Sequence, residues 1–304
     1  MADDERHRIP VILDTDIGTD IDDTWALTML LNSPELDLKL VVTETGDTEV
    51  RARIVAKMLE IGGRTDVPVG IGLRTEDLPI HHAGWVEGYD LCSYPGSISD
   101  DGVGALIDMI MAAPEPITLI CIGPVPNIAA ALEREPAIAG RARFVGMHGS
   151  VRRGYGGRPQ IDAEYNVVRD PQACQQSFAA PWEVTITPVD TCGLVRLTGE
   201  KYRAVRDSSA PLARALMENY RLWAAHANPA GGIDPDVCSS TLFDPVAVYL
   251  AFFEELLVME RLGIRVTDDG YTRIDETAKE IKCATAWRDL GAFEDLLVER
   301  LIRR

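Results

Sequence analysis

Short apolar runs alternate with helical patterns along the first half of the chain. The apolar runs are PVILD (10–14), LKLVVTET (38–45), VPVGIG (67–72), ITLICIG (117–123) and ARFVGMHG (142–149). Apolar residues at helical spacing lie between them, at residues 50–63, 103–113 and 127–135. Because strands joined by helical crossovers pair in parallel, this alternation predicts an α/β fold with a mainly parallel central sheet and helices on both faces.

The rest of the chain shows no internal repeat or shift in composition, so we expect a single domain over residues 1–304. Residues 74–102 lack periodicity and are predicted to form a long loop, a feature that often covers a functional site. Later, residues 242–256 are predicted as a helix. We then expect a hairpin at 263–276 with an Asp-Gly turn, and a closing helix at 287–303.

The charge balance limits the possible partners. The formal net charge is −18, from 48 acidic and 30 basic residues, which argues against binding to nucleic acid or to an anionic membrane. Six cysteines without a CxxC pair give no support for a zinc or redox site. The charged N-terminus and the lack of a membrane-length apolar run predict a cytoplasmic protein.

The segment DTDIGTDIDD (14–23) places five aspartates between an apolar strand and the next helix. In open α/β sheets, ligands bind at this carboxyl end of the strands. Converging carboxylates repel one another unless a cation lies between them, and oxygen-only ligands favour calcium or magnesium. The segment therefore predicts a metal site, and the simpler alternative is a solvated acidic turn that caps a helix.

Two other functions are compatible with an acidic loop. In a haloacid-dehalogenase-type magnesium phosphatase, Asp14 would be the nucleophile and Asp16 the acid/base, but Gly18 stands where that pattern has Thr or Val. An EF-hand spreads its ligands over twelve residues and ends in a bidentate Glu. The apolar strand directly before the loop argues against an EF-hand.

The segment LDTDIGTDIDDTWAL resembles the N-terminal signature of the nucleoside hydrolase family, of the inosine-uridine preferring N-ribohydrolase type, with two additional residues before Asp22 and Asp23. Further segments are similar to family motifs in the same order: VVTETGDT (41–48), ITLICIGPVPNIAAAL (117–132), AEYN (163–166) and FDPVAV (243–248). The resemblance implies a Rossmann-like open sheet, a Ca²⁺ cofactor, a homodimer or homotetramer, and hydrolysis of a ribonucleoside to ribose and free base.

The resemblance also implies roles for individual residues. The calcium ligands would be Asp16, Asp23, Asp244 and the backbone carbonyl of Pro126. Asp16 would also be the catalytic general base that takes a proton from the attacking water. The ribose would be bound by Asp22, Asp47, Glu164 and Asn166. The roles of Asp14 and Asp20 in the longer loop stay open.

The residues around the leaving base depart from the family pattern. Phe243 stands where many members have a general-acid histidine, and it could form an aromatic sandwich with Trp85 or Trp223. His82 or its neighbour His81 could replace the missing acid.

Arg158 stands where the family often has a ribose-contacting Asn. With Arg152 and Arg153 it either binds an anionic group of the substrate or balances surface charge. These departures leave three alternatives: an ordinary ribonucleoside, a modified or atypical ribosyl substrate, and a nucleoside- or ribose-binding protein without turnover.

Overall fold

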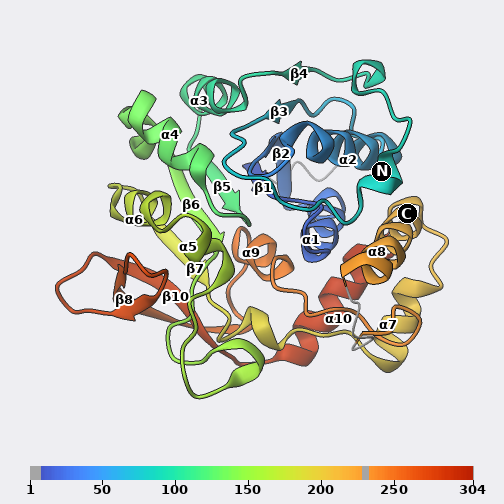
Figure 1. Cartoon of the computed structure of the whole chain (residues 1–304). Coiled ribbons are helices and arrows are strands. Elements are labelled where there is room, and N and C mark those ends of the chain that lie inside the picture. Colours follow the sequence, from blue (N-terminus) through green and yellow to red (C-terminus); the bar gives the residue numbers. More distant parts are fainter. Residues whose placement is uncertain (1–7, 228–232, 304) are drawn as a thin grey trace.

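The computed structural model describes residues 8–227 and 233–303, so the charged N-terminal seven residues and part of the turn-rich segment 227–236 lie outside it. The described chain forms a ten-stranded sheet in the order β4-β3-β2-β1-β5-β6-β7-β10-β8-β9, with helices around it (Figure 1). The predicted α/β fold is confirmed, whereas the single domain over 1–304 stays a prediction.

The strands are β1 (Ile9–Thr15), β2 (Leu36–Thr43), β3 (Val69–Ile71), β4 (Ile98–Ser99), β5 (Ile117–Cys121), β6 (Ala142–Met147), β7 (Val184–Thr187), β8 (Leu257–Val266), β9 (Thr272–Ile274) and β10 (Glu280–Trp287). The helices are α1 (Asp22–Leu31), α2 (Thr48–Ile61), α3 (Gly102–Ala112), α4 (Pro126–Arg134), α5 (Tyr165–Arg169), α6 (Pro171–Ala179), α7 (Gly199–Arg206), α8 (Pro211–Ala227), α9 (Pro245–Leu250) and α10 (Leu290–Leu301).

Strand β1 lies where the direction of sheet growth reverses. The chain adds β2, β3 and β4 on one side of β1, and then returns to place β5, β6 and β7 on the other side, all in parallel. Strand β10 pairs in parallel with β7, and only the β10–β8 and β8–β9 pairs are antiparallel. Because ligands bind at such a reversal, at the carboxyl ends of the strands, the topology directs attention to the loop after β1.

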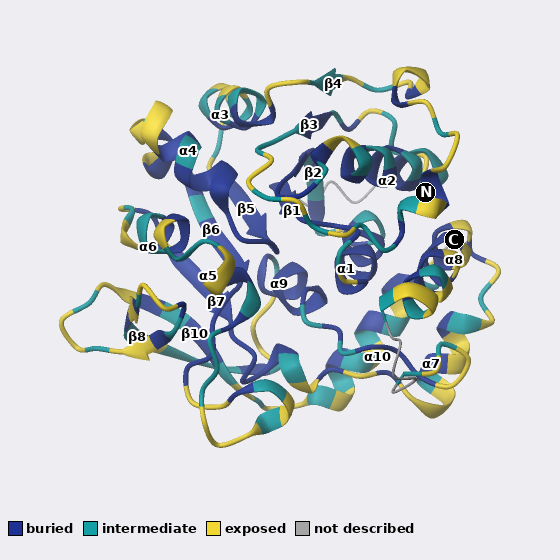
Figure 2. Ribbon diagram, in the orientation of Figure 1, coloured by how far each residue is buried: buried dark blue, intermediate teal, exposed yellow. Residues whose placement is uncertain are grey.

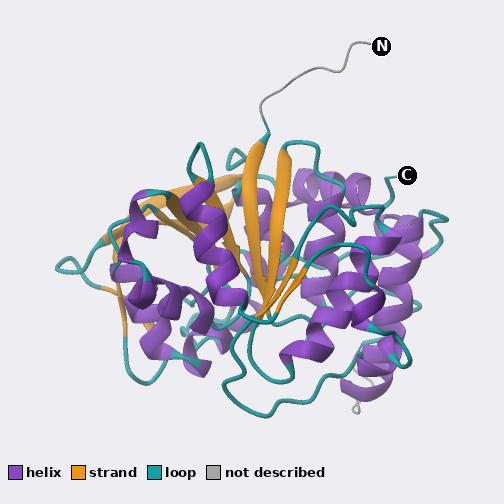
Figure 3. Cartoon of the chain, turned by 90° about the horizontal axis from the view of Figure 1, so that it is seen from above, coloured by secondary structure: helices purple, strands orange, loops and turns teal. Residues whose placement is uncertain are grey.

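Two apolar cores cover the two faces of the sheet. Along β1, Val11 and Leu13 belong to one core and Ile12 to the other, as expected when successive side chains alternate. The first core includes residues from α1, α2, α8, α9 and α10, and the second includes residues from α3, α4 and α6. Figure 3 shows the strands between these groups of helices, and Figure 2 shows that the central strands are buried.

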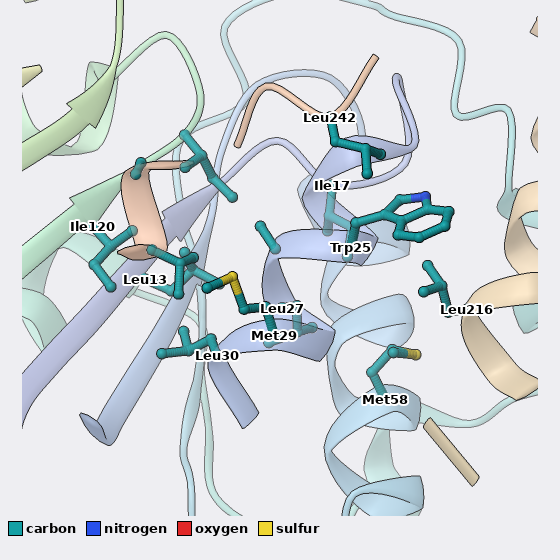
Figure 4. Close-up of a cluster of buried hydrophobic side chains, with 14 of the residues drawn as sticks. Leu13, Ile17, Trp25, Leu27, Met29, Leu30, Met58, Ile120, Leu216 and Leu242 are labelled. Carbon is teal, nitrogen blue, oxygen red and sulfur yellow. The ribbon is translucent and has the colours of Figure 1, made fainter. Parts of the chain in front are cut away.

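Helix α1 is buried along nearly its whole length, from Asp22 to Leu30. Trp25, Leu27 and Met29 join the first core together with Ile17 from the preceding loop (Figure 4). The two aspartates in the first turn of α1 are therefore fixed by the packing of the helix that carries them. No described helix is long and apolar enough to cross a membrane.

The C-terminal third differs from expectation. The predicted helix 242–256 is wrong in its second half, because α9 ends at Leu250 and β8 begins at Leu257. The chain turns there as Phe252 and Phe253 pack against the ring of Tyr249. The sequence interpretation also missed β7 and β10. The long loop predicted at 74–102 contains two short 3₁₀ turns and β4.

Candidate active site

A cavity of about 440 Å³ opens at the loop that follows β1. Its volume lies in the range of small-molecule sites. The lining residues are Asp16, Thr19, Asp20, Asp22, Asp23, His81, Ile122, Met147, Tyr155, Glu164, Tyr165, Asn166, Trp223, Ala227, Phe243 and Asp244. Carboxylates and aromatic rings therefore share one cavity, although they come from segments far apart in the sequence.

Three carboxylates of the described chain lie close enough together to hold a metal ion. Asp22, Asp23 and Asp244 each offer an oxygen within 4.8 Å of the others. Asp22 and Asp23 begin α1, and Asp244 directly precedes α9. Helices α1 and α9 pack against each other, and this contact brings the distant aspartate to the loop.

Burial raises the pKa of Asp22, Asp23 and Asp244 well above the usual range, and the charges of neighbouring aspartates raise it further. Each of the three residues is at most 5% exposed. A bound cation reverses this cost, because it favours the ionised form of every carboxylate around it. The oxygen-only donor set fits a hard divalent cation.

Asp16 lines the same cavity but does not belong to the three-carboxylate group. Burial raises the pKa of Asp16 to about 6, and the nearby Arg51 guanidinium opposes this rise. Asp20 also lines the cavity, and its carboxylate accepts a hydrogen bond from the Ile21 amide at 2.7 Å. Asp14, by contrast, is fully buried behind the cavity wall, where it accepts a hydrogen bond from Asn127 at 2.8 Å.

Glu164 and Asn166, which the resemblance assigns to the ribose, both line the cavity. The Glu164 carboxylate caps α5 and accepts hydrogen bonds from the amides of Gly149 and Asn166, both at 2.9 Å. Burial raises the pKa of Glu164 to about 7 despite these bonds. Asn166 donates its side-chain amide to the Met147 carbonyl at 2.9 Å. Both side chains are thus held firmly in place.

Two of the residues predicted to bind ribose or metal do not line the cavity. Asp47 caps α2 by accepting a hydrogen bond from the Val50 amide at 3.1 Å, which directs its carboxylate to the helix. Pro126 begins α4 and is buried. It follows Val125, whose φ of 65° gives the chain a sharp turn after β5. Metal binding by the Pro126 carbonyl stays a prediction.

Trp223 and Phe243 line the cavity, whereas Trp85 does not. The rings of Phe243 and Tyr155 meet edge to face, with centroids 5.8 Å apart. Trp85 instead donates a hydrogen bond to Glu218 at 3.1 Å and lies in a shallow surface pocket beneath the ammonium of Lys57. An aromatic sandwich can therefore include Phe243 and Trp223, but Trp85 lies outside the cavity.

The two loop histidines have different positions. His82 does not line the cavity, and burial lowers its pKa to about 3. His81 does line it, and its pKa is lowered by partial burial and by the nearby His226. His81 is therefore the neighbour that can contact a ligand, and it is mainly neutral at neutral pH.

The three arginines of the 150–158 loop make contacts away from the cavity. Arg152 pairs with Glu260, Arg158 pairs with Asp162 at 2.8 Å, and Arg153 donates to the Gly157 carbonyl at 3.2 Å. None of the three lines the cavity in the described chain. Their contacts favour the interpretation that these side chains balance surface charge.

Tyr155 and Tyr165 line the cavity but were not among the predicted site residues. Tyr165 lies between Glu164 and Asn166 in the AEYN segment, so its place in the motif was a usable signal. Tyr155 lies in a glycine-rich loop without periodicity. Only the folded loop brings it to Phe243.

Comparisons with known proteins find similar proteins over most of the chain. The family model described as inosine-uridine preferring nucleoside hydrolase matches residues 11–291. A non-specific ribonucleoside hydrolase RihC of Klebsiella pneumoniae subsp. pneumoniae is 32% identical over 227 residues, which is 70% of this chain and 73% of that protein. The RihC of Salmonella agona is 36% identical over 225 residues, 69% of this chain and 71% of that protein.

Solved structures show the same fold. The plant nucleoside hydrolase PpNRh1 superposes with a TM-score of 0.82 and 25% identity, covering 97% of this chain and 99% of that chain. A purine-preferring ribonucleoside hydrolase from Gardnerella vaginalis superposes with a TM-score of 0.77 and 24% identity, covering 96% and 98% of the two chains.

Proposed function

The chain belongs to the inosine-uridine preferring nucleoside hydrolase family and is an N-ribohydrolase, and from this premise we propose that it uses calcium to hydrolyse the N-glycosidic bond of a ribonucleoside. The products are ribose and the free base. The observation that carries the proposal is the buried group of Asp22, Asp23 and Asp244, whose carboxylate oxygens lie within 4.8 Å of one another beside an aromatic-lined cavity.

The proposed ligands of the ion are Asp16, Asp23, Asp244 and the Pro126 carbonyl. Asp22, which resemblance assigns to the ribose, is also within reach of the same ion. When bound, calcium would supply a Lewis acid that chelates sugar hydroxyls and increases the acidity of a water molecule. Calcium is favoured over zinc because every donor is an oxygen.

Asp16 is the proposed general base. Its carboxylate lines the cavity beside the three clustered aspartates, where it can accept a proton from the attacking water. The water oxygen forms the bond to C1′ while the C1′–N bond breaks, and the electron pair of that bond passes to the base nitrogen. Positive charge grows on the sugar during this step, and the buried carboxylates around the cavity stabilise it.

The leaving base is proposed to lie against Phe243, Trp223 and Tyr155, because flat apolar rings bind heteroaromatic bases by stacking. His81 lines the same cavity, and the N–H of its neutral ring can donate a hydrogen bond to the departing nitrogen. Glu164 and Asn166 are proposed to bind the ribose, as resemblance implies. Asp47, which resemblance also assigns to the ribose, caps α2 and does not line the cavity.

A nucleoside-binding protein without turnover is the second candidate. Phe243 in place of an acid, and the lowered pKa of His81, favour it because both weaken protonation of the leaving group. An atypical ribosyl substrate whose leaving group needs no acid is consistent with the same features. A cytoplasmic homo-oligomer remains our inference from the sequence.

The test is release of free ribose from a panel of purine and pyrimidine nucleosides, with calcium and after chelation. We expect calcium-dependent ribose from at least one nucleoside, its loss in Asp23→Asn, and normal activity in Asp108→Asn, which changes an exposed carboxylate on α3. Tight inosine binding without ribose would favour the binding protein. Turnover of p-nitrophenyl phosphate with magnesium would instead indicate a phosphatase.

A further inference from the structure

Arg51 is fully buried beneath the acidic loop, on the first turn of α2. Its guanidinium donates to the carbonyl oxygens of Asp16 and Ile17, the latter at 2.8 Å. It also donates to the Thr19 hydroxyl at 2.8 Å. All three partners belong to the loop that follows β1. This loop carries Asp16, the proposed base, and leads to Asp22 and Asp23 at the start of α1.

The same guanidinium also binds the loop that follows β2. Its Nε donates to the Thr45 carbonyl at 2.8 Å. Thr45 and Gly46 both have a φ of 54°, a conformation that a threonine rarely adopts and that the surrounding contacts must hold. One side chain therefore connects the loops at the carboxyl ends of two neighbouring parallel strands.

The hydrogen-bond acceptors of Arg51 are backbone carbonyls and one hydroxyl. Two features show how closely the loops fit around it. A Cβ on Gly46 would lie 3.0 Å from Arg51 Nη2, and Gly18 next to Ile17 has a φ of +115°. The planar guanidinium of arginine has several N–H donors and can bind acceptors on both loops, whereas the single ammonium of a lysine cannot reach both loops at once.

We propose that Arg51 is a positioning residue that holds the acidic loop in its metal-binding conformation before the metal arrives. It acts through the backbone of Asp16 and Ile17 and does not contact the ion. The inference rests on the proposed function, since it concerns calcium binding at the same group of aspartates. Residues that support metal ligands in this way typically change metal affinity by about 10- to 100-fold when they are replaced.

The test compares Arg51→Met and Arg51→Lys with the unchanged protein by isothermal titration with calcium. The hydrogen bonds to both loops are lost in the methionine variant, and most are lost in the lysine variant, which keeps the positive charge. If Arg51 positions the loop, both variants bind calcium about 10-fold or more weakly. If Arg51 acts only as a nearby positive charge, Arg51→Met binds calcium more tightly and Arg51→Lys is unchanged, which overturns the proposal.

Amide hydrogen exchange of the metal-free proteins gives a second readout that needs neither calcium nor turnover. We expect faster exchange at the amides of residues 15–21 in both variants, and equal exchange would overturn the proposal. Leu59→Ala is the matched control, because Leu59 is a fully buried core residue of the same helix. It should lower stability without weakening calcium binding. Absence of calcium binding by the unchanged protein would instead overturn the proposed cofactor.

Discussion

Replacement of His148 by phenylalanine should make the protein relatively more stable in acid. His148 follows β6 and is fully buried, with Nε2 3.0 Å from the Gly123 carbonyl oxygen. Its ring packs against Phe144 and Phe178, at centroid distances of 5.5 and 6.1 Å, so a phenyl ring suits the site. Burial lowers the pKa of His148 from 6.5 to about 3.

The pH dependence of stability follows from the numbers of protons that the folded and unfolded chains bind at His148. Below pH 6.5 the unfolded chain binds a proton at His148 that the folded protein rejects, so the free energy of unfolding falls as the pH falls. Each pH unit below that value costs about 1.4 kcal/mol, which amounts to about 2 kcal/mol at pH 5. Above pH 6.5 this contribution is absent, and His148→Phe loses only the hydrogen bond to Gly123, worth about 1 kcal/mol.

The assay is urea unfolding of both proteins at pH 8 and pH 5 in the presence of a chelator, so that metal release does not contribute. From pH 8 to pH 5, the unfolding free energy of His148→Phe relative to that of the unchanged protein should rise by about 2 kcal/mol. Phe178→Leu is the control, because it perturbs the same aromatic cluster but leaves His148 in place. Its unfolding free energy should differ from that of the unchanged protein by the same amount at both pH values. An equal difference at pH 8 and pH 5 for His148→Phe would refute the reasoning.

Three further predictions concern the acidic loop and the carboxylate group that it forms with Asp244. Asp244→Asn should weaken calcium binding by about 10-fold or more, measured by titration, because it removes one of three clustered carboxylates; unchanged affinity would contradict the assignment. Chelation of the unchanged protein should lower its melting temperature, and calcium should restore it. Gly18→Ala should cost about 1–3 kcal/mol in urea unfolding, since its φ is +115° and the added Cβ would lie 2.8 Å from Ile80 Cγ2. Gly140→Ala, which meets nothing within 4 Å, should be nearly neutral.

The sheet was predictable where structure follows from local pattern. Strands β1, β2, β5 and β6 are mostly apolar and are each followed by a helix or a helical turn, and each was expected within a few residues of its bounds. Strand β10, EIKCATAW, was missed because it lies at the end of the chain, where the alternation of apolar runs and helical patterns no longer holds. It pairs with β7 and β8, so its strand conformation depends on contacts with segments that are distant in the sequence or antiparallel to it, and not on a local pattern.

The candidate site was predictable as a set of segments and less so as individual side chains. The acidic loop, Glu164, Asn166 and the segment at Asp244 all line one cavity. Motif order cannot give the direction of a side chain, however. His81 and His82 are neighbours in the sequence, yet only His81 reaches the cavity.

The contact between α1 and α9 also sets the time at which the site appears during biosynthesis. Asp22 and Asp23 leave the ribosome early, whereas Asp244 follows only after most of the sheet has been translated. Chains are synthesised at about 5–20 residues per second, so the early aspartates wait many seconds for their partner. The nascent chain thus carries an incomplete acidic group throughout most of its synthesis. The proposed metal site can therefore form only after Asp244 has been synthesised.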